Sequence, residues 1–466
     1  MNIGLNLGVN LGVNLGVNIV DENQTAAADA ITGENLKAWR GSILHFLSDP
    51  DAADANAVHN SYQYFCDGLL VTQSGRVAAL GNATDLLPRL SAGTALTHYR
   101  NALIVPGFID THIHYPQTEM IAAYGEQLLQ WLQTYTFPVE RKFENAEYAA
   151  TTAAFFLRQL LCNGTTTALV FGSVHPQSVE AFFNAAEAQN LRMICGKVMM
   201  DRNAPDYLID TPQSAYSDSE ALIAKWHRRG RLQYAVTPRF APTSSAEQLR
   251  LAGQLLREHA DVYLHTHLAE NLDEVAWVKT LFPGCKHYLD SYDQFGLLGR
   301  RSVFAHGIHL CDDEYRRLGA SRSALAFCPT SNLFLGSGLF NLKRAQQYRI
   351  NVGLGTDVGG GTSFSLLQTL NEAYKVQQLR GDTLTPFKAF YLATLGGARA
   401  LDLDHCIGNF AAGKEADFTV LDYRATELLA MRMEQCKSLQ ERLFVLAMLG
   451  DDRAVKATYI MGEQLK

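Results

Sequence analysis

Residues 106–114 read Pro-Gly-Phe-Ile-Asp-Thr-His-Ile-His, a β-type run that ends in two histidines, His112 and His114. Side chains alternate between the two faces of a strand, so both imidazoles point one way and Ile113 points the other. An isolated His-x-His pair is as often a surface or core pair as a chelate. Its place at the end of an apolar run favours two metal ligands at the end of a strand.

Three further apolar runs, far apart in the chain, end in the same manner. They lead to His267 in Tyr-Leu-His-Thr-His-Leu-Ala-Glu, to His306 in Phe-Ala-His-Gly and to Asp357 in Gly-Thr-Asp. In a barrel of parallel strands, the C-terminal strand ends meet on one face. Together the runs therefore predict one metal site assembled across a barrel.

The rest of the sequence supports that barrel, because eight candidate strands alternate with helical stretches such as 147–162, 178–188 and 246–259. Such alternation implies parallel strands with right-handed crossovers, and hence an α/β fold of the (β/α)8 TIM type. All the ligand candidates fall at C-terminal strand ends, where the active residues of such barrels lie. The candidate strands are residues 103–114, 165–172, 192–201, 232–243, 262–270, 302–310, 323–332 and 351–361.

Both ends of the chain carry short β-like runs that lie outside this alternation. Residues 67–72, 76–81 and 102–105 form one group, and residues 417–422 and 457–461 form the other. Chain ends often lie close together, so the two groups are expected to pair in one small β domain. The predicted division is a composite β domain from 34–105 plus 411–466, with the barrel that holds the metal site at 106–410.

The first residues contain Leu-Gly-Val-Asn three times, at 7–10, 11–14 and 15–18. A secretory signal has a basic start and an apolar stretch without an Asn at every fourth position, and neither feature is present. Residues 1–33 are therefore predicted to be a low-complexity, disordered tail with no part in the chemistry.

Composition narrows the class of partner and the compartment. The net charge of -7 argues against a nucleic-acid or anionic-membrane partner. No apolar run reaches the roughly 18 residues that a membrane-spanning helix needs. The eight cysteines are scattered without a Cys-x-x-Cys pair, which fits a reducing cytoplasm better than a disulfide framework.

The ligand set indicates the metal. Three imidazoles and one carboxylate suit zinc, with iron as the usual competitor. A second metal would need a bridging lysine on strand four, but Lys197 lies on strand three by our count and is interpreted as structural. We therefore expect one zinc ion per subunit.

Other histidines lie near the candidate ligands. His265 lies one layer deeper in the barrel than His267 and is predicted to be a packed histidine. His309 is expected to leave the site with its loop. His175 could reach the mouth of the pocket or remain a loop histidine.

A metal ion lowers the pKa of a bound water to about 7, and an acid–base group must then move its proton. Glu270, three residues after His267, suits that task. His306 can hold the water or stabilise charge beside it, and Asp357 can both bind metal and accept a proton. The predicted catalytic residues are therefore Glu270, His306 and Asp357.

Three residues at strand ends favour a flat, polar heterocycle as the substrate. Arg239 offers a fork of donors for a carbonyl oxygen or an anionic group. Gln117 offers a donor and an acceptor to a ring edge. Phe240 could stack on a planar ring.

These motifs lead to a resemblance. Residues 106–117 resemble the amidohydrolase superfamily, and residues 124–138 and 196–207 are similar to stretches particular to the guanine deaminases. The resemblance covers roughly residues 34–466. Further matching stretches are residues 236–244, 265–271, 327–338 and 355–362.

The resemblance implies a zinc enzyme, usually a homodimer, that hydrolyses guanine to xanthine and ammonia in purine breakdown. Our mechanistic hypothesis is attack of the zinc-activated water at C2 of guanine, with Glu270 protonating a ring nitrogen. The implied metal ligands are His112, His114, His267 and Asp357. The implied substrate contacts are His114, Tyr115, Pro116, Gln117, Arg239, Phe240, His267, Leu268, Ala269, Glu270 and Asp357.

Rival functions remain open at this point. Zinc deaminases of the cytidine type need His-x-Glu with Pro-Cys-x-x-Cys, and the chain has neither. A related barrel aminohydrolase could act on 8-oxoguanine, a pterin or an s-triazine. An amide-bond hydrolase of the same superfamily would more often carry a lysine on strand four. A non-catalytic scaffold would be expected to have lost a ligand.

Overall fold

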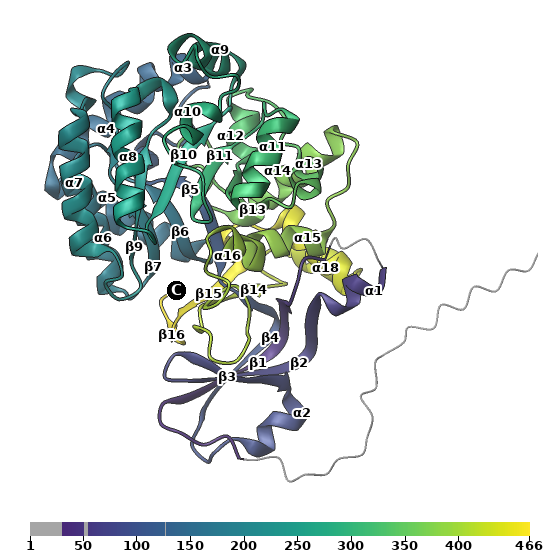
Figure 1. Ribbon diagram of the computed structural model, residues 1–466. Helices are drawn as coiled ribbons and strands as arrows, with labels where there is room; N and C mark the ends of the chain where they lie inside the picture. The colour runs from purple at the N-terminus through teal and green to yellow at the C-terminus, as the bar shows by residue number, and fades with distance from the viewer. Residues whose placement is uncertain (1–29, 51–54, 126) are drawn as a thin grey trace, which may run out of the picture.

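The computed structural model describes residues 30–50, 55–125 and 127–466 (Figure 1). Most of the predicted tail at residues 1–33 lies outside this part of the chain, so its prediction is not tested. Among the described residues, no helix is both long and apolar enough to cross a membrane.

Eight parallel strands follow one another around a near-closed barrel, as the sequence predicts. The first and last strands are joined at the seam, where the Thr111 hydroxyl donates to the Leu354 carbonyl at 3.0 Å. The short β8 (Val198–Met199) continues the third strand and pairs with the fourth. In chain order the eight are β5 (Phe108–His114), β6 (Thr165–Phe171), β7 (Arg192–Gly196), β9 (Gln233–Pro238), β10 (Tyr263–Leu268), β11 (Ser302–His306), β12 (Ala324–Phe327) and β13 (Asn351–Leu354).

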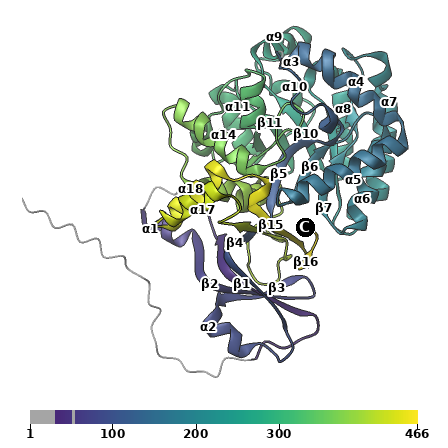
Figure 2. The same ribbon diagram turned by 180° about the vertical axis from the view of Figure 1, so that it is seen from behind.

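Helices cover the outside of the barrel, one or more after each strand (Figures 1 and 2). In α8 (Ala246–Glu258), the Ser245 side chain caps the start, and Leu249, Ala252 and Leu255 bury one face. The predicted helices at 147–162, 178–188 and 246–259 are confirmed within two residues. The other main helices are α5 (Ala146–Cys162), α6 (Pro176–Ala188), α7 (Pro212–Trp226), α9 (Leu272–Leu281), α11 (Asp312–Ser321), α13 (Leu342–Gln347) and α14 (Leu366–Leu379).

The other helices lie over the C-terminal face of the barrel or beside the second sheet. The segment after β5 runs from α3 (Leu128–Trp131) through a π turn at Leu132–Thr136 into α4 (Phe137–Glu140). The remaining α-helices are α1 (Ala55–Asn60), α2 (Ala83–Leu86), α10 (Asp290–Asp293), α12 (Pro329–Phe334), α15 (Pro386–Tyr391), α16 (Gly397–Ala400), α17 (Glu427–Glu434) and α18 (Leu439–Leu449).

A second sheet of seven strands contains strands from both parts of the chain. Its centre is β4, which runs antiparallel to β14 and parallel to β1. The predicted pairing of the two chain ends is thus confirmed, while the domain boundaries at residues 105/106 and 410/411 stay a prediction. The strands, in spatial order, are β16 (Glu463–Gln464), β15 (Val455–Ile460), β14 (Phe418–Asp422), β4 (Ala95–Pro106), β1 (Leu36–Phe46), β2 (Tyr62–Gln73) and β3 (Arg76–Asn82).

The predicted strand at 103–114 is two strands in different sheets, because the chain leaves β4 at Pro106 and enters β5 at Phe108. Gly107 fits the crossing point, since a Cβ there would lie 2.1 Å from Thr166 Oγ1. The predicted strand at 323–332 is also too long: β12 ends at Phe327, and Pro329 opens a helix.

The floor of the barrel is filled, which places any site at the opposite, C-terminal end. Buried Leu401, Leu403 and Ile407 pack against the interior side chains of the strands. The Tyr263 hydroxyl donates to the Leu401 carbonyl at 2.7 Å. The barrel is therefore a packed core that is open at one end only.

Candidate metal centre and substrate pocket

The four predicted metal ligands meet at the C-terminal end of the barrel. His112, His114, His267 and Asp357 each place one ligand atom within 4.8 Å of the others. His114 Nε2 lies 3.2 Å from His267 Nε2, and Asp357 Oδ1 lies 3.1 Å from His112 Nε2 and 3.3 Å from His114 Nε2. Ligands of a tetrahedral metal at about 2.0–2.1 Å lie about 3.3 Å apart, so these separations fit a bound ion.

Backbone geometry brings Asp357 to the histidines although 245 residues separate it from His112. The Asp357 amide donates to the His112 carbonyl at 2.9 Å. The buried Asp110 carboxylate accepts the amides of His112 and Thr356 at 3.1 and 3.2 Å. Asp357 itself has a positive φ of 49°, a conformation that costs energy and is common at functional sites. The strand β5 and the turn after β13 are thus held as one unit.

The protonation states of the four side chains favour metal binding. Burial lowers the pKa of His112 and His267, and it lowers the pKa of His114 to about 3. Burial alone would raise the pKa of Asp357, but the adjacent imidazoles, His112 first, hold it well below its usual value. Three neutral imidazoles and one carboxylate are the forms that bind a divalent metal such as zinc.

The outer nitrogens of two ligand histidines, His112 and His267, are held by the surrounding structure. His267 Nδ1 lies 2.7 Å from the Arg239 carbonyl, so an N–H there leaves Nε2 free to face the metal position. His112 Nδ1 lies 2.7 Å from Nε2 of the buried His265. His265 thus contacts a ligand rather than belonging to the group of four, which fits the packed role predicted for it.

Glu270 and His306 lie beside the metal position. Glu270 Oε2 is 3.4 Å from His306 Nε2, which is 3.8 Å from Asp357 Oδ2. His306 Nδ1 contacts Asn332 Oδ1 at 2.8 Å, which fixes the ring. Burial first and the charge of Asp357 second raise the pKa of Glu270 to about 8. A carboxyl with such a pKa exchanges protons near neutral pH.

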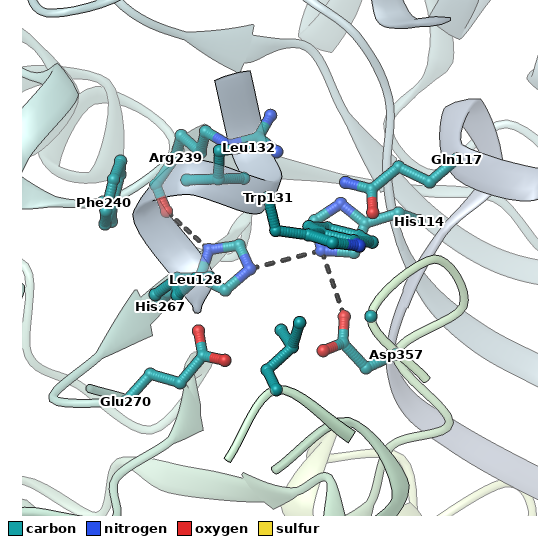
Figure 3. Close-up of a pocket in the computed structure, with 12 residues that line it drawn as sticks. His114, Gln117, Leu128, Trp131, Leu132, Arg239, Phe240, His267, Glu270 and Asp357 are labelled. Atoms are coloured by element: carbon teal, nitrogen blue, oxygen red, sulfur yellow. Dashed lines mark hydrogen bonds and ion pairs between the residues drawn. The ribbon is translucent and has the colours of Figure 1, made fainter. Parts of the chain in front are cut away.

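A pocket opens directly above this centre (Figure 3). Its polar wall contains Arg239 and Gln117, which are 3% and 2% exposed. Apolar side chains from three segments form the other walls. The space between these walls, including the part that is open to solvent, is about 380 Å³. The lining residues are His114, Gln117, Leu128, Trp131, Leu132, Arg239, Phe240, His267, Glu270, Leu335, Asp357 and Gly360.

Four predicted contact residues do not line this pocket: Tyr115, Pro116, Leu268 and Ala269. The Tyr115 ring packs among phenylalanines under the barrel helices, and its hydroxyl donates to the Ser178 carbonyl at 2.6 Å. Ala269, with a positive φ of 47°, forms the turn that directs Glu270 inward. Direct contact of these four with a substrate stays a prediction.

The remaining candidates lie away from the four ligands. Lys197 is buried and donates to the Asp210 carboxylate at 2.5 Å, which agrees with a structural role. His309 Nε2 lies 2.9 Å from the Ser337 carbonyl. His175 immediately precedes α6, outside the pocket lining.

Sequence reasoning missed a set of residues from the segment after β5. Leu128, Trp131 and Leu132 cover the pocket, and the buried indole N–H of Trp131 has no hydrogen-bond partner among the described residues. Glu140, at the end of α4, is fully buried against Arg239 and Gln117. Only the apolar spacing of residues 128–139 and a lone acid after Phe-Pro-Val could have indicated them.

A converging metal-ligand group at the open end of a (β/α)8 barrel defines a metal-dependent hydrolase. The model of the amidohydrolase family matches residues 103–465. The chain belongs to the amidohydrolase family.

Comparison with individual proteins is more specific. The guanine deaminase of Escherichia coli K12 is 55% identical over 433 residues, which are 93% of this chain and 98% of that protein. The structure of E. coli guanine deaminase matches with a TM-score of 0.90 over 92% of this chain and 99% of that one. Guanine deaminase from C. acetobutylicum, solved with guanine bound in the active site, is 31% identical with a TM-score of 0.83, over 93% of this chain and all of that one. The expected resemblance to guanine deaminases is thus confirmed.

Proposed function

We propose that the protein is a guanine deaminase, which hydrolyses guanine to xanthine and ammonia in purine breakdown. One observation carries the proposal: a metal-ligand group, a buried acid and a polar pair for a planar ring share one small pocket. Guanine deaminases related over almost the whole chain support it.

The metal we propose is zinc, one ion per chain, with iron as the alternative. The four ligands would be His112, His114, His267 and Asp357. Bound there, the ion would lower the pKa of a coordinated water to about 7 and so activate it for hydrolysis. Its support is the donor set and its spacing.

Three residues would move and hold protons. Glu270, a buried acid beside the metal position, would take a proton from the attacking water and pass it to a ring nitrogen beside C2 of guanine. His306 and Asp357, 3.8 Å apart, would orient the water. The remaining proton of the former water would then pass to the exocyclic amine, the C2–N bond breaks with its electron pair going to nitrogen, and ammonia leaves as C2=O forms.

The polar wall would bind the far side of the purine. Arg239 would donate to O6, Gln117 would bind a ring edge, and Phe240 would lie against the ring. Each of these side chains is almost fully buried, so a mispaired substrate would leave a buried polar group without a partner. The pocket should therefore reject adenine strongly.

We also propose a cytoplasmic homodimer. The eight cysteines are unpaired, as expected in a reducing compartment. The dimer rests on the family resemblance alone, and light scattering of the purified protein would test it: a mass near 103 kDa is expected for two chains of 51.5 kDa.

Ammonia release from the zinc-loaded protein tests the proposed activity. The substrates are guanine, 8-oxoguanine, adenine, cytosine, a pterin and an s-triazine. We expect fast release from guanine with xanthine formed. Faster release from another ring would keep the metal centre but overturn the substrate, and no release from any ring would leave another hydrolase or a scaffold.

A further inference from the structure

Glu140 is a fully buried acid that does not touch the metal ligands. Its carboxylate accepts from Arg239 Nη1 at 3.0 and 2.8 Å, and Oε1 also accepts from Gln117 Nε2 at 3.1 Å. One carboxylate therefore contacts both residues of the polar wall.

This contact sets the direction of the Gln117 amide. An ionised carboxylate can only accept hydrogen bonds, so it selects the NH₂ end of the amide. The carbonyl oxygen then becomes the free end of Gln117; in Figure 3 the amide nitrogen lies toward Arg239 and the oxygen lies away from it. With Glu140 in place, Arg239 offers donors while Gln117 offers an acceptor.

We propose that Glu140 is a positioning residue that fixes this donor–acceptor order and thereby selects one kind of purine edge. The inference rests on the proposed function and identifies a residue that determines substrate specificity at the same site. An edge with a carbonyl beside an N–H, such as C6=O and N1–H of guanine, matches the pair. Adenine and 2,6-diaminopurine instead have an amine beside a ring nitrogen without hydrogen. Their amine donor would face the Arg239 donors, and their ring-nitrogen acceptor would face the Gln117 acceptor.

A merely structural Glu140 would act differently. If it only neutralised Arg239 or supported α4, its loss would weaken every ligand to a similar degree. A residue that sets hydrogen-bond direction changes the ratio between ligands, because sites built for one pattern reject the other by about 10⁴–10⁵ in catalysis. The ratio is therefore the quantity to measure.

The first test uses ligands without an amine at C2, so that no deamination at that carbon is needed. Titration calorimetry of zinc-loaded protein compares hypoxanthine, which has the carbonyl and N–H edge, with adenine. Wild type is expected to prefer hypoxanthine at least about 100-fold. Glu140→Gln, whose amide can also donate and so permits Gln117 to turn, should reduce that preference at least tenfold, while Glu140→Asp retains more of it than Glu140→Gln.

Glu415→Gln is the matched control, because Glu415 is also buried and accepts from two arginines, Arg192 and Arg231, far from the pocket. Its ligand preference should equal that of wild type. An unchanged preference in Glu140→Gln, or no preference in wild type, would overturn the inference. If Glu140→Gln does not fold, Gln117→Met, which removes the acceptor, must reduce the same preference, and an unchanged ratio again overturns it.

Kinetics then separate this inference from the proposed function. Guanine and 2,6-diaminopurine have the same reacting amine at C2 and differ at C6 and N1. Glu140→Gln should lower the ratio of their kcat/KM values at least tenfold, and an equal loss on both would contradict the positioning role. If the wild type binds hypoxanthine selectively but releases no ammonia from guanine, the proposed activity is refuted. The positioning role of Glu140 is then decided by the calorimetric comparison of hypoxanthine with adenine.

Discussion

Glu270 follows the ligand His267 by three residues, yet its environment fits it for a different task. It is 3% exposed and contacts His306 and Ser337, at 3.4 and 3.3 Å, and it does not belong to the group of four ligand residues. Replacing its carboxyl should therefore remove proton transfer without removing the metal.

We predict that Glu270→Gln retains one metal per chain but loses about 10³-fold in kcat for guanine, the typical contribution of a positioned acid–base group. Steady-state kinetics with metal analysis of the same sample checks it. Turnover within tenfold of wild type would refute the proton-transfer role.

His265 contacts His112 Nδ1 at 2.7 Å and so orients a ligand that it does not replace. His265→Ala should weaken zinc about 10–100-fold, as is usual when a partner of a metal ligand is lost. Competition with a fluorescent chelator measures the affinity, and His175→Ala, outside the pocket, is the control. Equal zinc affinity in both variants would show that His265 only fills space.

Among single residues, the local sequence predicted those that stand at the end of a strand. His112, His114, His267 and Asp357 were found because each ends an apolar run. Glu140 was not, because its partners lie 23 and 99 residues away, and the apolar spacing of the residues before it does not show that its helix folds back over the barrel. Long-range contacts of single side chains leave no periodic signal.

Among the elements, β1 shows how a single histidine joins distant segments. His45 is 2% exposed; its Nε2 contacts Gln63 Oε1 on β2, and its Nδ1 accepts the Phe410 amide from the loop after the barrel. Burial, partly opposed by the bond to Gln63, lowers the pKa of His45 to about 4. The ring is therefore neutral in the folded protein at pH 7.

Stability should accordingly fall in mild acid. The unfolded chain binds a proton below about pH 6.5, whereas the folded chain does so only near pH 4, so the contribution of His45 is full above pH 6.5 and is lost as the pH falls toward 4. At about 1.4 kcal/mol per pH unit, the loss by pH 5 is about 2 kcal/mol.

Urea unfolding at pH 7 and pH 5 tests this. The difference in unfolding free energy between wild type and His45→Gln should change by about 2 kcal/mol, and the exposed His59→Gln should show no such change. A constant difference for His45→Gln would contradict the assignment.

The helices and strands were predictable where strand–helix alternation repeats along the chain. Eight strand–helix alternations identified the barrel, but strand ends were placed too far along because residues 329–332 and 355–361, which are polar or glycine-rich, were counted with the apolar strands that they follow. The passage of the chain from β4 to β5 at Gly107 could not be predicted from the sequence pattern, since residues 103–114 are β-like on both sides of Gly107.

For the molecule as a whole, buried ion pairs connect the barrel to the second sheet. Arg192 begins β7 and Arg231 precedes β9, and both donate to Glu415, at 2.7 and 2.8 Å; Arg231 also pairs with Asp417. Breaking such a network leaves buried charges without partners.

Glu415→Gln should therefore lower the free energy of unfolding by about 3 kcal/mol and leave kcat/KM for guanine unchanged. Chemical unfolding and kinetics on one preparation measure both. A fall in kcat/KM beyond about threefold, in fully folded protein, would mean that the junction also controls the active site.

The most direct measurement is xanthine formation from guanine as zinc is titrated into metal-free protein. The rate should be near zero without metal, rise in proportion to added zinc and reach its plateau at one zinc per chain. A plateau at two equivalents, or no xanthine at any loading of folded protein, would contradict a one-metal guanine deaminase.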